Sequence, residues 1–182
     1  MKRNIFIGIG VIIIAIGAFA LYEILIVSKR SPEKTTSYDF QDLNVKVVYC
    51  QPSKRGRLIF GEEKDNALQP YGKYWRLGAN APTQITFNKN ISFAGSPVNA
   101  GTYRMYAVPG SAAFQIFLNS DIGFSGASEP DHTKDIVKAE IPVQSTSETE
   151  QFVINFGSDS TSVNMDFVWD KVLVRVPITG NK

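Results

Sequence analysis

The start of the chain differs from the rest in the spacing of its apolar side chains. From Ile5 to Val27 nearly every residue is apolar, and Glu23 is the one charged residue in that stretch. A helix of about 20 apolar residues spans the hydrocarbon core of a bilayer, whereas a soluble surface helix keeps a polar face. The pattern therefore predicts one N-terminal transmembrane helix, with residues 1–27 serving as a membrane anchor.

The anchor carries residues that suit contact with a second membrane helix. Gly8, Gly10 and Gly17 leave room for another backbone to approach closely. Glu23 lies near the end of the span, where a charged group is better tolerated beside a partner. We expect these four residues to form a helix-packing surface.

The same residues also fit a cleavable signal sequence. A basic start at residues 1–4 precedes an apolar core, and Ala18, Phe19 and Ala20 have the small–any–small pattern of a cleavage site. The apolar run continues past that site to Val27, which favours an uncleaved anchor. We expect the N-terminus in the cytoplasm and the bulk of the chain across the membrane, with release after cleavage following Ala20 as the alternative.

Beyond the apolar segment the pattern changes twice. Residues 28–37 are polar apart from Pro32 and predict a flexible tether. From Tyr38 onward, short segments alternate apolar and polar side chains with period two, which is typical of strands with one buried face. The predicted strands are Asn44–Cys50, Thr83–Phe87, Ile91–Phe93, Thr102–Val108, Phe114–Leu118, Asp135–Ile141, Gln151–Phe156, Ser162–Val168 and Lys171–Ile178. Residues 38–182 are therefore expected to form an all-β domain, an antiparallel β-sandwich of undecided jelly-roll or immunoglobulin-like topology.

Composition narrows the chemistry open to the chain. Aromatic residues make up 12% of it, which suits a β-protein, and a net charge of +2 gives no reason to expect a nucleic-acid partner. One Cys and one His exclude an internal disulfide and a zinc site of the usual Cys/His kind. No glycine-rich phosphate loop or nucleophile elbow is present. We expect no cofactor, no metal and a non-catalytic function.

Two polar segments combine residue types that are common at binding sites. The first, Lys54–Arg57, holds two guanidinium groups, Arg55 and Arg57, which suit a carboxylate or a phosphate. The second supplies aromatic rings, cations and an amide: Tyr71, Lys73, Tyr74, Trp75, Arg76 and Asn80. A structural explanation stands beside each. The first segment also fits a solvated turn or internally paired arginines, and the second fits Trp75 closing one end of the sandwich with Arg76 packed on a ring.

The longest predicted loop, Gly123–Thr133, raises the one catalytic alternative. His132 lies beside Asp131 and three residues before Asp135, a spacing that allows acid–base chemistry or a weak metal site. No nucleophile or second catalytic carboxylate accompanies them at a recognisable spacing. A hydrolase is therefore the weakest of the functions considered.

Two longer motifs resemble a known family. They are Gln51–Gly61 (QPSKRGRLIFG) and Pro70–Thr83 (PYGKYWRLGANAPT), and the similarity extends over about Val45 to Ile178. The chain resembles the family catalogued as domain of unknown function 2911, which implies a β-rich, bacterial, exported domain and implies no activity. Ala81 stands where that family usually has Glu, and Phe114 where it usually has Trp. If that Glu balances an arginine or binds a ligand in relatives, the arrangement is altered in this chain.

These observations lead to one expected function and two alternatives. The first is a non-catalytic, membrane-anchored extracytoplasmic β-domain, an accessory or interaction subunit of an envelope complex. Its expected partners are membrane lipid and another envelope or membrane protein, with the domain in the periplasm and the anchor in the bacterial inner membrane. The alternatives are a glycan- or peptide-binding module that uses the aromatic and arginine residues, and the hydrolase.

Overall fold

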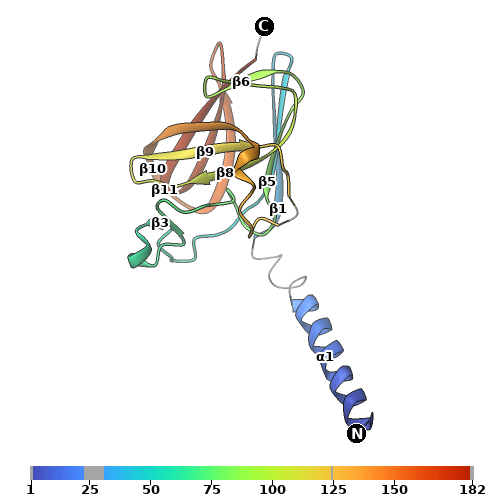
Figure 1. Cartoon of the computed structure of the whole chain (residues 1–182). Helices are drawn as coiled ribbons and strands as arrows, with labels where there is room; N and C mark the ends of the chain where they lie inside the picture. Colours follow the sequence, from blue (N-terminus) through green and yellow to red (C-terminus); the bar gives the residue numbers. More distant parts are fainter. Residues whose placement is uncertain (1, 23–30, 124, 181–182) are drawn as a thin grey trace.

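A computed structural model describes residues 2–22, 31–123 and 125–180 of the 182-residue chain (Figure 1). Helix α1 (Lys2–Tyr22) is followed by a body made almost entirely of strands. The strands are β1 (Glu33–Phe40), β2 (Leu43–Cys50), β3 (Phe60–Gly61), β4 (Gln69–Pro70), β5 (Thr83–Phe87), β6 (Ile91–Phe93), β7 (Ser96–Val98), β8 (Gly101–Val108), β9 (Ala113–Asn119), β10 (Asp135–Ser158) and β11 (Val163–Gly180). Two single-turn 3₁₀ helices, η2 (Glu63–Asp65) and η3 (His132–Lys134), complete the described elements.

Helix α1 exposes its described apolar side chains. Ile14 is 72% exposed, and Val11, Ile13 and Phe19 are exposed to similar extents. A Cβ added at Gly8, Gly10 or Gly17 would meet no atom within 4 Å. None of the helices in the described part of the chain is long and apolar enough to cross a membrane. The transmembrane helix over residues 5–27 stays a prediction, and Glu23 lies outside the described residues.

Nine strands form one antiparallel sheet in the order β1-β2-β5-β8-β9-β10-β11-β6-β7, and β3 and β4 form a separate parallel pair. The predicted all-β class is confirmed in this form. The sheet bends back on itself through β10, so that side chains from both of its halves meet in one apolar core (Figure 1). At one end of the sheet, the Tyr38 ring of β1 stacks on Phe156 of β10 with ring centroids 5.9 Å apart.

Four of the predicted strands form only two long strands, β10 and β11, in the structure. Residues 135–142 of β10 pair with β9, and residues 143–158 pair with β11. The register shifts on both sides of Thr149, which is where a bulge lets a strand bend and twist. Gln151–Phe156 therefore continues Asp135–Ile141, and Lys171–Ile178 continues Ser162–Val168 within β11. The predicted breaks, at the mainly polar residues 142–150 and at residues 169–170, are wrong.

The expected tether is wrong over Glu33–Ser37, because these residues belong to β1. The whole of β1 pairs with β2, from Glu33 opposite Cys50 to Phe40 opposite Leu43. An edge strand needs only backbone pairing on one side, so it can carry polar side chains that face water. Residues 28–30 of the tether lie outside the described residues.

The turn between β10 and β11 depends on one carboxylate. Asp159 Oδ1 accepts from the backbone N–H groups of Thr161 and Ser162, both at 2.8 Å, and Oδ2 accepts from the Ser162 hydroxyl at 2.7 Å. The Ser162 hydroxyl and these backbone donors lower the pKa of Asp159 below its ordinary value.

We predict that Asp159→Asn destabilises the chain at neutral pH and does so progressively less as the pH falls below about 4. A carboxyl whose pKa is lower in the folded than in the unfolded state stabilises the fold above about pH 4, and that stability is lost as the pH falls through the folded-state value. Urea unfolding of the parent and the variant between pH 7 and pH 2 tests this. The difference in unfolding free energy should stay constant down to about pH 4 and shrink below it, and a difference that is unchanged at pH 2 would contradict the assignment.

Candidate functional site

The predicted basic segment forms a fixed turn at one end of the body. The Lys54 ammonium lies 2.6 Å from Glu148 and 2.7 Å from Asp170. The hydrogen bond to Asp170, and after it the one to Glu148, raises the pKa of Lys54. Glu150 Oε1 accepts from the backbone N–H of Arg55 at 2.8 Å. Arg55 and Gly56 both have positive φ, 51° and 69°, so the chain reverses tightly here.

Arg57 is held by backbone carbonyls. Its Nε donates to Lys54 O at 3.0 Å, and its Nη2 donates to Ser53 O at 2.7 Å. Within the part of the chain that the structure describes, no carboxylate pairs with it. The turn therefore fixes the guanidinium in place and leaves its charge unneutralised.

The second predicted segment is joined to the sheet at Trp75. The backbones of Trp75 and Ala107 exchange two hydrogen bonds of 2.8 Å. After Trp75 the chain turns sharply through Leu77 and Asn80, whose φ values are 51° and 56°. A Cβ on the intervening Gly78 would lie 2.7 Å from Cys50 O, so glycine is needed there for close approach to β2. Arg76 Nη1 donates to Asn80 O at 3.2 Å.

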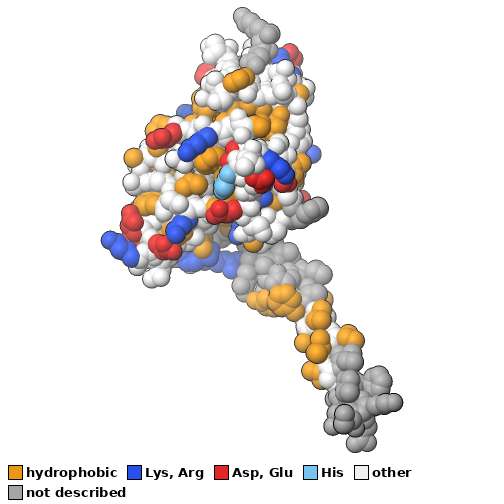
Figure 2. All heavy atoms as spheres, in the orientation of Figure 1, with side chains coloured by type: hydrophobic (Ala, Val, Ile, Leu, Met, Phe, Trp, Pro, Cys, Tyr) orange, Lys and Arg blue, Asp and Glu red, His pale blue; other side chains and the backbone are white. Residues whose placement is uncertain are grey.

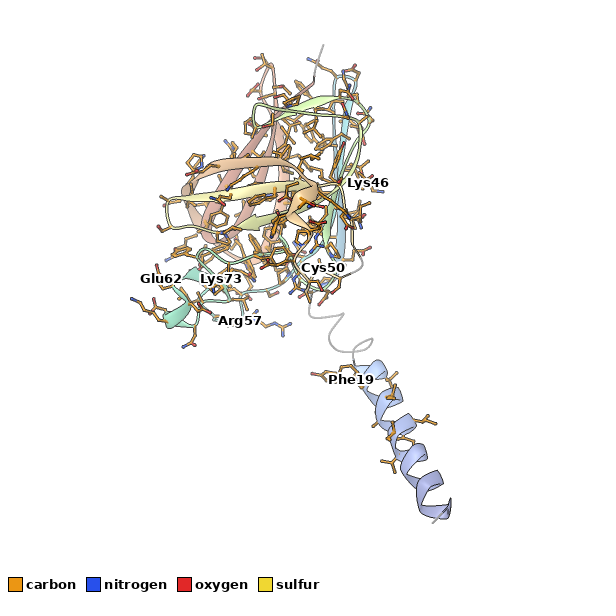
Figure 3. The ribbon with its side chains drawn as sticks, in the orientation of Figure 1. Phe19, Lys46, Cys50, Arg57, Glu62 and Lys73 are labelled. Carbon is orange, nitrogen blue, oxygen red and sulfur yellow. The ribbon has the colours of Figure 1, made fainter. Side chains whose placement is uncertain are left out.

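These two segments together line a pocket of about 460 Å³, which we call the arginine pocket. Its walls include five of the eight residues singled out from the sequence, namely Arg57, Tyr74, Trp75, Arg76 and Asn80. The remaining lining residues are Ser31, Pro52, Leu68, Gln69, Pro70, Gly78, Ala79 and Trp169. None of these lining residues is acidic, so the arginine pocket carries two guanidinium charges. Figure 2 shows Lys and Arg side chains along the lower edge of the body, and Figure 3 labels Arg57 at that end.

Most of Trp75 belongs to the core. It is 2% exposed, and its ring packs against Phe152 at 5.0 Å and Phe60 at 5.4 Å between centroids. Trp169 stacks on it at 5.9 Å, with an angle of 25° between the ring planes. Phe114, at the position where Trp was expected, closes the same cluster and is 1% exposed. Trp75 therefore lines the arginine pocket only with the edge of its ring, and the rest of the side chain is buried in the aromatic cluster.

Three of the predicted residues do not line the arginine pocket. Tyr71 is half-buried against the core, and the exposed Lys73 pairs with Glu63 at 3.3 Å. Arg55 is exposed, and its guanidinium has no partner among the described residues. Ala81 is exposed beside Asn80, and no carboxylate in the described ranges pairs with Arg76.

The predicted loop Gly123–Thr133 forms hydrogen bonds to residues that line the arginine pocket. This contact is not predicted by the sequence. Gly126 accepts from the Tyr74 hydroxyl at 3.1 Å and donates from its N–H to Asn80 O at 3.2 Å. Arg104 of β8, only 3% exposed, donates from Nη2 to Tyr74 Oη and to Ser128 O. Its Nε is buried and has no hydrogen-bond partner among the described residues. Arg104 lies on the face of β8 opposite to the core residues Met105 and Ala107, and the loop covers that face.

His132 and Asp135, two residues of the catalytic alternative, connect the end of the same loop to Tyr106 of β8. Tyr106 donates to Asp135 Oδ2 at 2.7 Å, and its hydroxyl also lies 2.8 Å from His132 Nδ1. Burial, followed by the hydrogen bond to Asp135, raises the pKa of Tyr106, so the phenol stays protonated. Asp131 caps η3 by accepting a hydrogen bond from Thr133 N at 3.0 Å. Among the side chains that the structure describes, no group of three or more His, Cys, Asp or Glu residues is arranged to hold a metal ion.

The chain is thus a mostly-β protein with a nine-stranded antiparallel sheet and an arginine-lined pocket at one end. A sequence model described as "Protein of unknown function (DUF2911)" matches residues 31–178, and the chain belongs to that family. The resemblance seen in the two motifs is thereby confirmed. Comparison with curated proteins and with solved structures gives no match.

Proposed function

We propose that this protein is a non-catalytic binding module whose arginine pocket takes an anionic group, a carboxylate or a phosphate. The observation that carries the proposal is that Arg57 and Arg76 line one pocket whose described walls contain no acid. Arg76 is half-buried and Arg57 is exposed, and neither has a carboxylate partner among the described residues. Their N–H donors that make no bond within the described chain can therefore bind a carboxylate or a phosphate from a ligand.

The guanidinium groups are oriented before any ligand arrives. Two carbonyls fix Arg57, and Asn80 O fixes Arg76, so less side-chain entropy is lost on binding. Each group keeps further N–H donors for an anion, and arginine holds carboxylate and phosphate with paired hydrogen bonds. The rings of Tyr74, Trp75 and Trp169 add apolar surface beside the charges.

The chain supplies its own reporter of ligand binding. Both of its tryptophans, Trp75 and Trp169, line the arginine pocket, so intrinsic fluorescence responds to an occupant. We expect a saturable fluorescence change when the full-length chain in nonionic detergent is titrated with inorganic phosphate, hexaglutamate or an oligogalacturonate. A hydrogen bond to a charged group contributes about 1.5–3 kcal/mol, so Arg57→Gln and Arg76→Gln should each weaken binding roughly 10- to 100-fold.

Lys46→Gln is the matched control. Lys46 is an exposed cation of β2 that does not line the arginine pocket, and Figure 3 labels it away from Arg57. Its loss should leave the binding curve unchanged. The proposal fails if no anion changes the fluorescence, or if Lys46→Gln weakens binding as much as the two arginine variants do.

We further propose that the apolar segment of residues 5–27 anchors this module in a bacterial inner membrane, with the β-domain in the periplasm as an accessory subunit. Support comes from the length and apolarity of that segment and from the exposed side chains of α1. The sheet, bent back over one core, favours a sandwich as its finer classification. Alkaline extraction of native membranes tests the anchoring, because an uncleaved anchor keeps the chain in the membrane pellet.

A further inference from the structure

We infer that the anion bound in the arginine pocket is the phosphate of an anionic phospholipid in the membrane that holds the chain. This inference rests on the proposed function and names the ligand of the same pocket. It follows from where the pocket lies along the chain, from the charges at that end of the body and from the make-up of the pocket walls.

The arginine pocket is tied closely to the N-terminal segment. Ser31 lines the pocket, and Tyr22 is the last residue of α1. Nine peptide steps separate them, and a fully extended chain covers at most about 3.6 Å per residue, or roughly 30 Å. With residues 5–27 in a bilayer, the arginine pocket cannot lie farther than that from the end of the span. It is therefore kept within reach of the lipid headgroups.

Glu148 and Asp170 at this end pair with Lys54, and Glu150 accepts from the backbone of Arg55, so the guanidinium groups are the charges left without a partner among the described residues. Arg55 is exposed on the turn that positions Arg57, and neither guanidinium has a carboxylate partner in the described ranges. Arg76 adds a third such group from the neighbouring segment. Clusters of basic residues next to a membrane anchor are attracted to anionic lipids over about one Debye length. A pocket held near the membrane meets lipid phosphates at high local concentration, whereas its position does not raise the local concentration of a soluble acidic peptide.

The pocket walls suit the parts of a headgroup. The guanidinium groups of Arg57 and Arg76 suit the phosphate oxygens. Pro52, Leu68 and Pro70 give apolar surface for the glycerol backbone, and Asn80 and Gln69 offer hydrogen bonds to hydroxyl or ester oxygens. Tyr74 and the tryptophan edges have the mixed polar and apolar character that aromatic residues use at membrane interfaces.

The test uses the full-length chain in nonionic detergent with tryptophan fluorescence as the readout. The probes are dihexanoyl-phosphatidylglycerol, dihexanoyl-phosphatidylcholine, inorganic phosphate and hexaglutamate. We expect the phosphatidylglycerol to bind at least tenfold more tightly than the other three. Arg57→Gln and Arg76→Gln should each weaken it at least tenfold, and Lys46→Gln should not change it. In nanodiscs the parent chain should show the bound-state fluorescence with phosphatidylglycerol present and lack it with phosphatidylcholine alone.

The outcomes separate this inference from the proposed function. If hexaglutamate binds in an arginine-dependent way and phosphatidylglycerol does not, the lipid assignment is overturned and the binding module stands. Inorganic phosphate binding as tightly as the lipid would equally overturn the lipid assignment, because the pocket would then recognise a free anion. If no probe binds, both proposals fail.

Discussion

Trp75→Ala is expected to lower the free energy of unfolding by about 3–5 kcal/mol, the usual cost of removing a large aromatic side chain from a core. Trp75 contacts Phe60, Phe152 and Trp169 in one cluster and is 2% exposed. The truncation leaves a cavity that the paired backbone of the Ala107 bridge cannot collapse to fill. Urea unfolding of the full-length chain followed by circular dichroism measures the effect.

Two further variants distinguish a core role of Trp75 from a ligand contact. Trp75→Phe keeps part of the ring packing and should lose clearly less stability than Trp75→Ala. Leu58→Ala removes an apolar side chain that is 46% exposed, so it should change stability by about 0.5 kcal/mol or less. If Trp75→Ala unfolds at the parent's urea midpoint and yet no longer binds anions, the ring acts on the ligand and the core assignment is wrong.

Gly126→Ala should impair both stability and anion binding. A Cβ there would lie 2.5 Å from Asn80 O and 2.7 Å from Arg76 Cδ, too close for either to remain in place. Overpacking of this kind costs about 1–3 kcal/mol. Because the displaced atoms belong to the wall of the arginine pocket, we expect affinity for the preferred anion to fall about tenfold at temperatures where the variant is still folded.

Gly157→Ala is the matched control for that substitution. Gly157 lies in β10, and a Cβ added to it would meet no atom within 4 Å. Its replacement should leave anion binding unchanged and should keep or slightly raise stability, because alanine has less backbone entropy to lose on folding. Equal binding losses in the two variants would show that the loop around Gly126 does not position the pocket wall.

Much of the sheet could be predicted from alternation alone. Thr83–Phe87 and Ile91–Phe93 are strands with the predicted bounds, since a period of two matches a pleated strand with one buried face. Strand β1 is not predicted because Glu33–Ser37 contains no apolar residue and therefore no alternation of apolar and polar side chains. Strand β10 is predicted as two strands because the polar residues at its bend look the same, in sequence, as polar residues in a turn. Strand β11 is divided at Asp170, which has a φ of 54° within the strand, a conformation more usual in turns.

The candidate site was predicted in part. Motif spacing indicated Arg57, Arg76 and Asn80, which the fold brings to one pocket from two segments about 20 residues apart along the chain. Arg104 was missed, because a polar residue in an alternating strand is expected to face water. It is buried by a loop that begins some 20 residues later, and no local pattern records that contact.

The sequence by itself determined the β-class of the body, the apolar segment at its start and the residue types available for binding. These depend on the local periodicity of side chains and on composition, which the chain carries at every point. Only the tertiary structure decided which arginines share a pocket, that Trp75 belongs mainly to the core and that the Gly123–Thr133 loop covers the outer face of β8. Those outcomes depend on contacts between residues far apart in sequence, which are selected by the packing of the whole sheet.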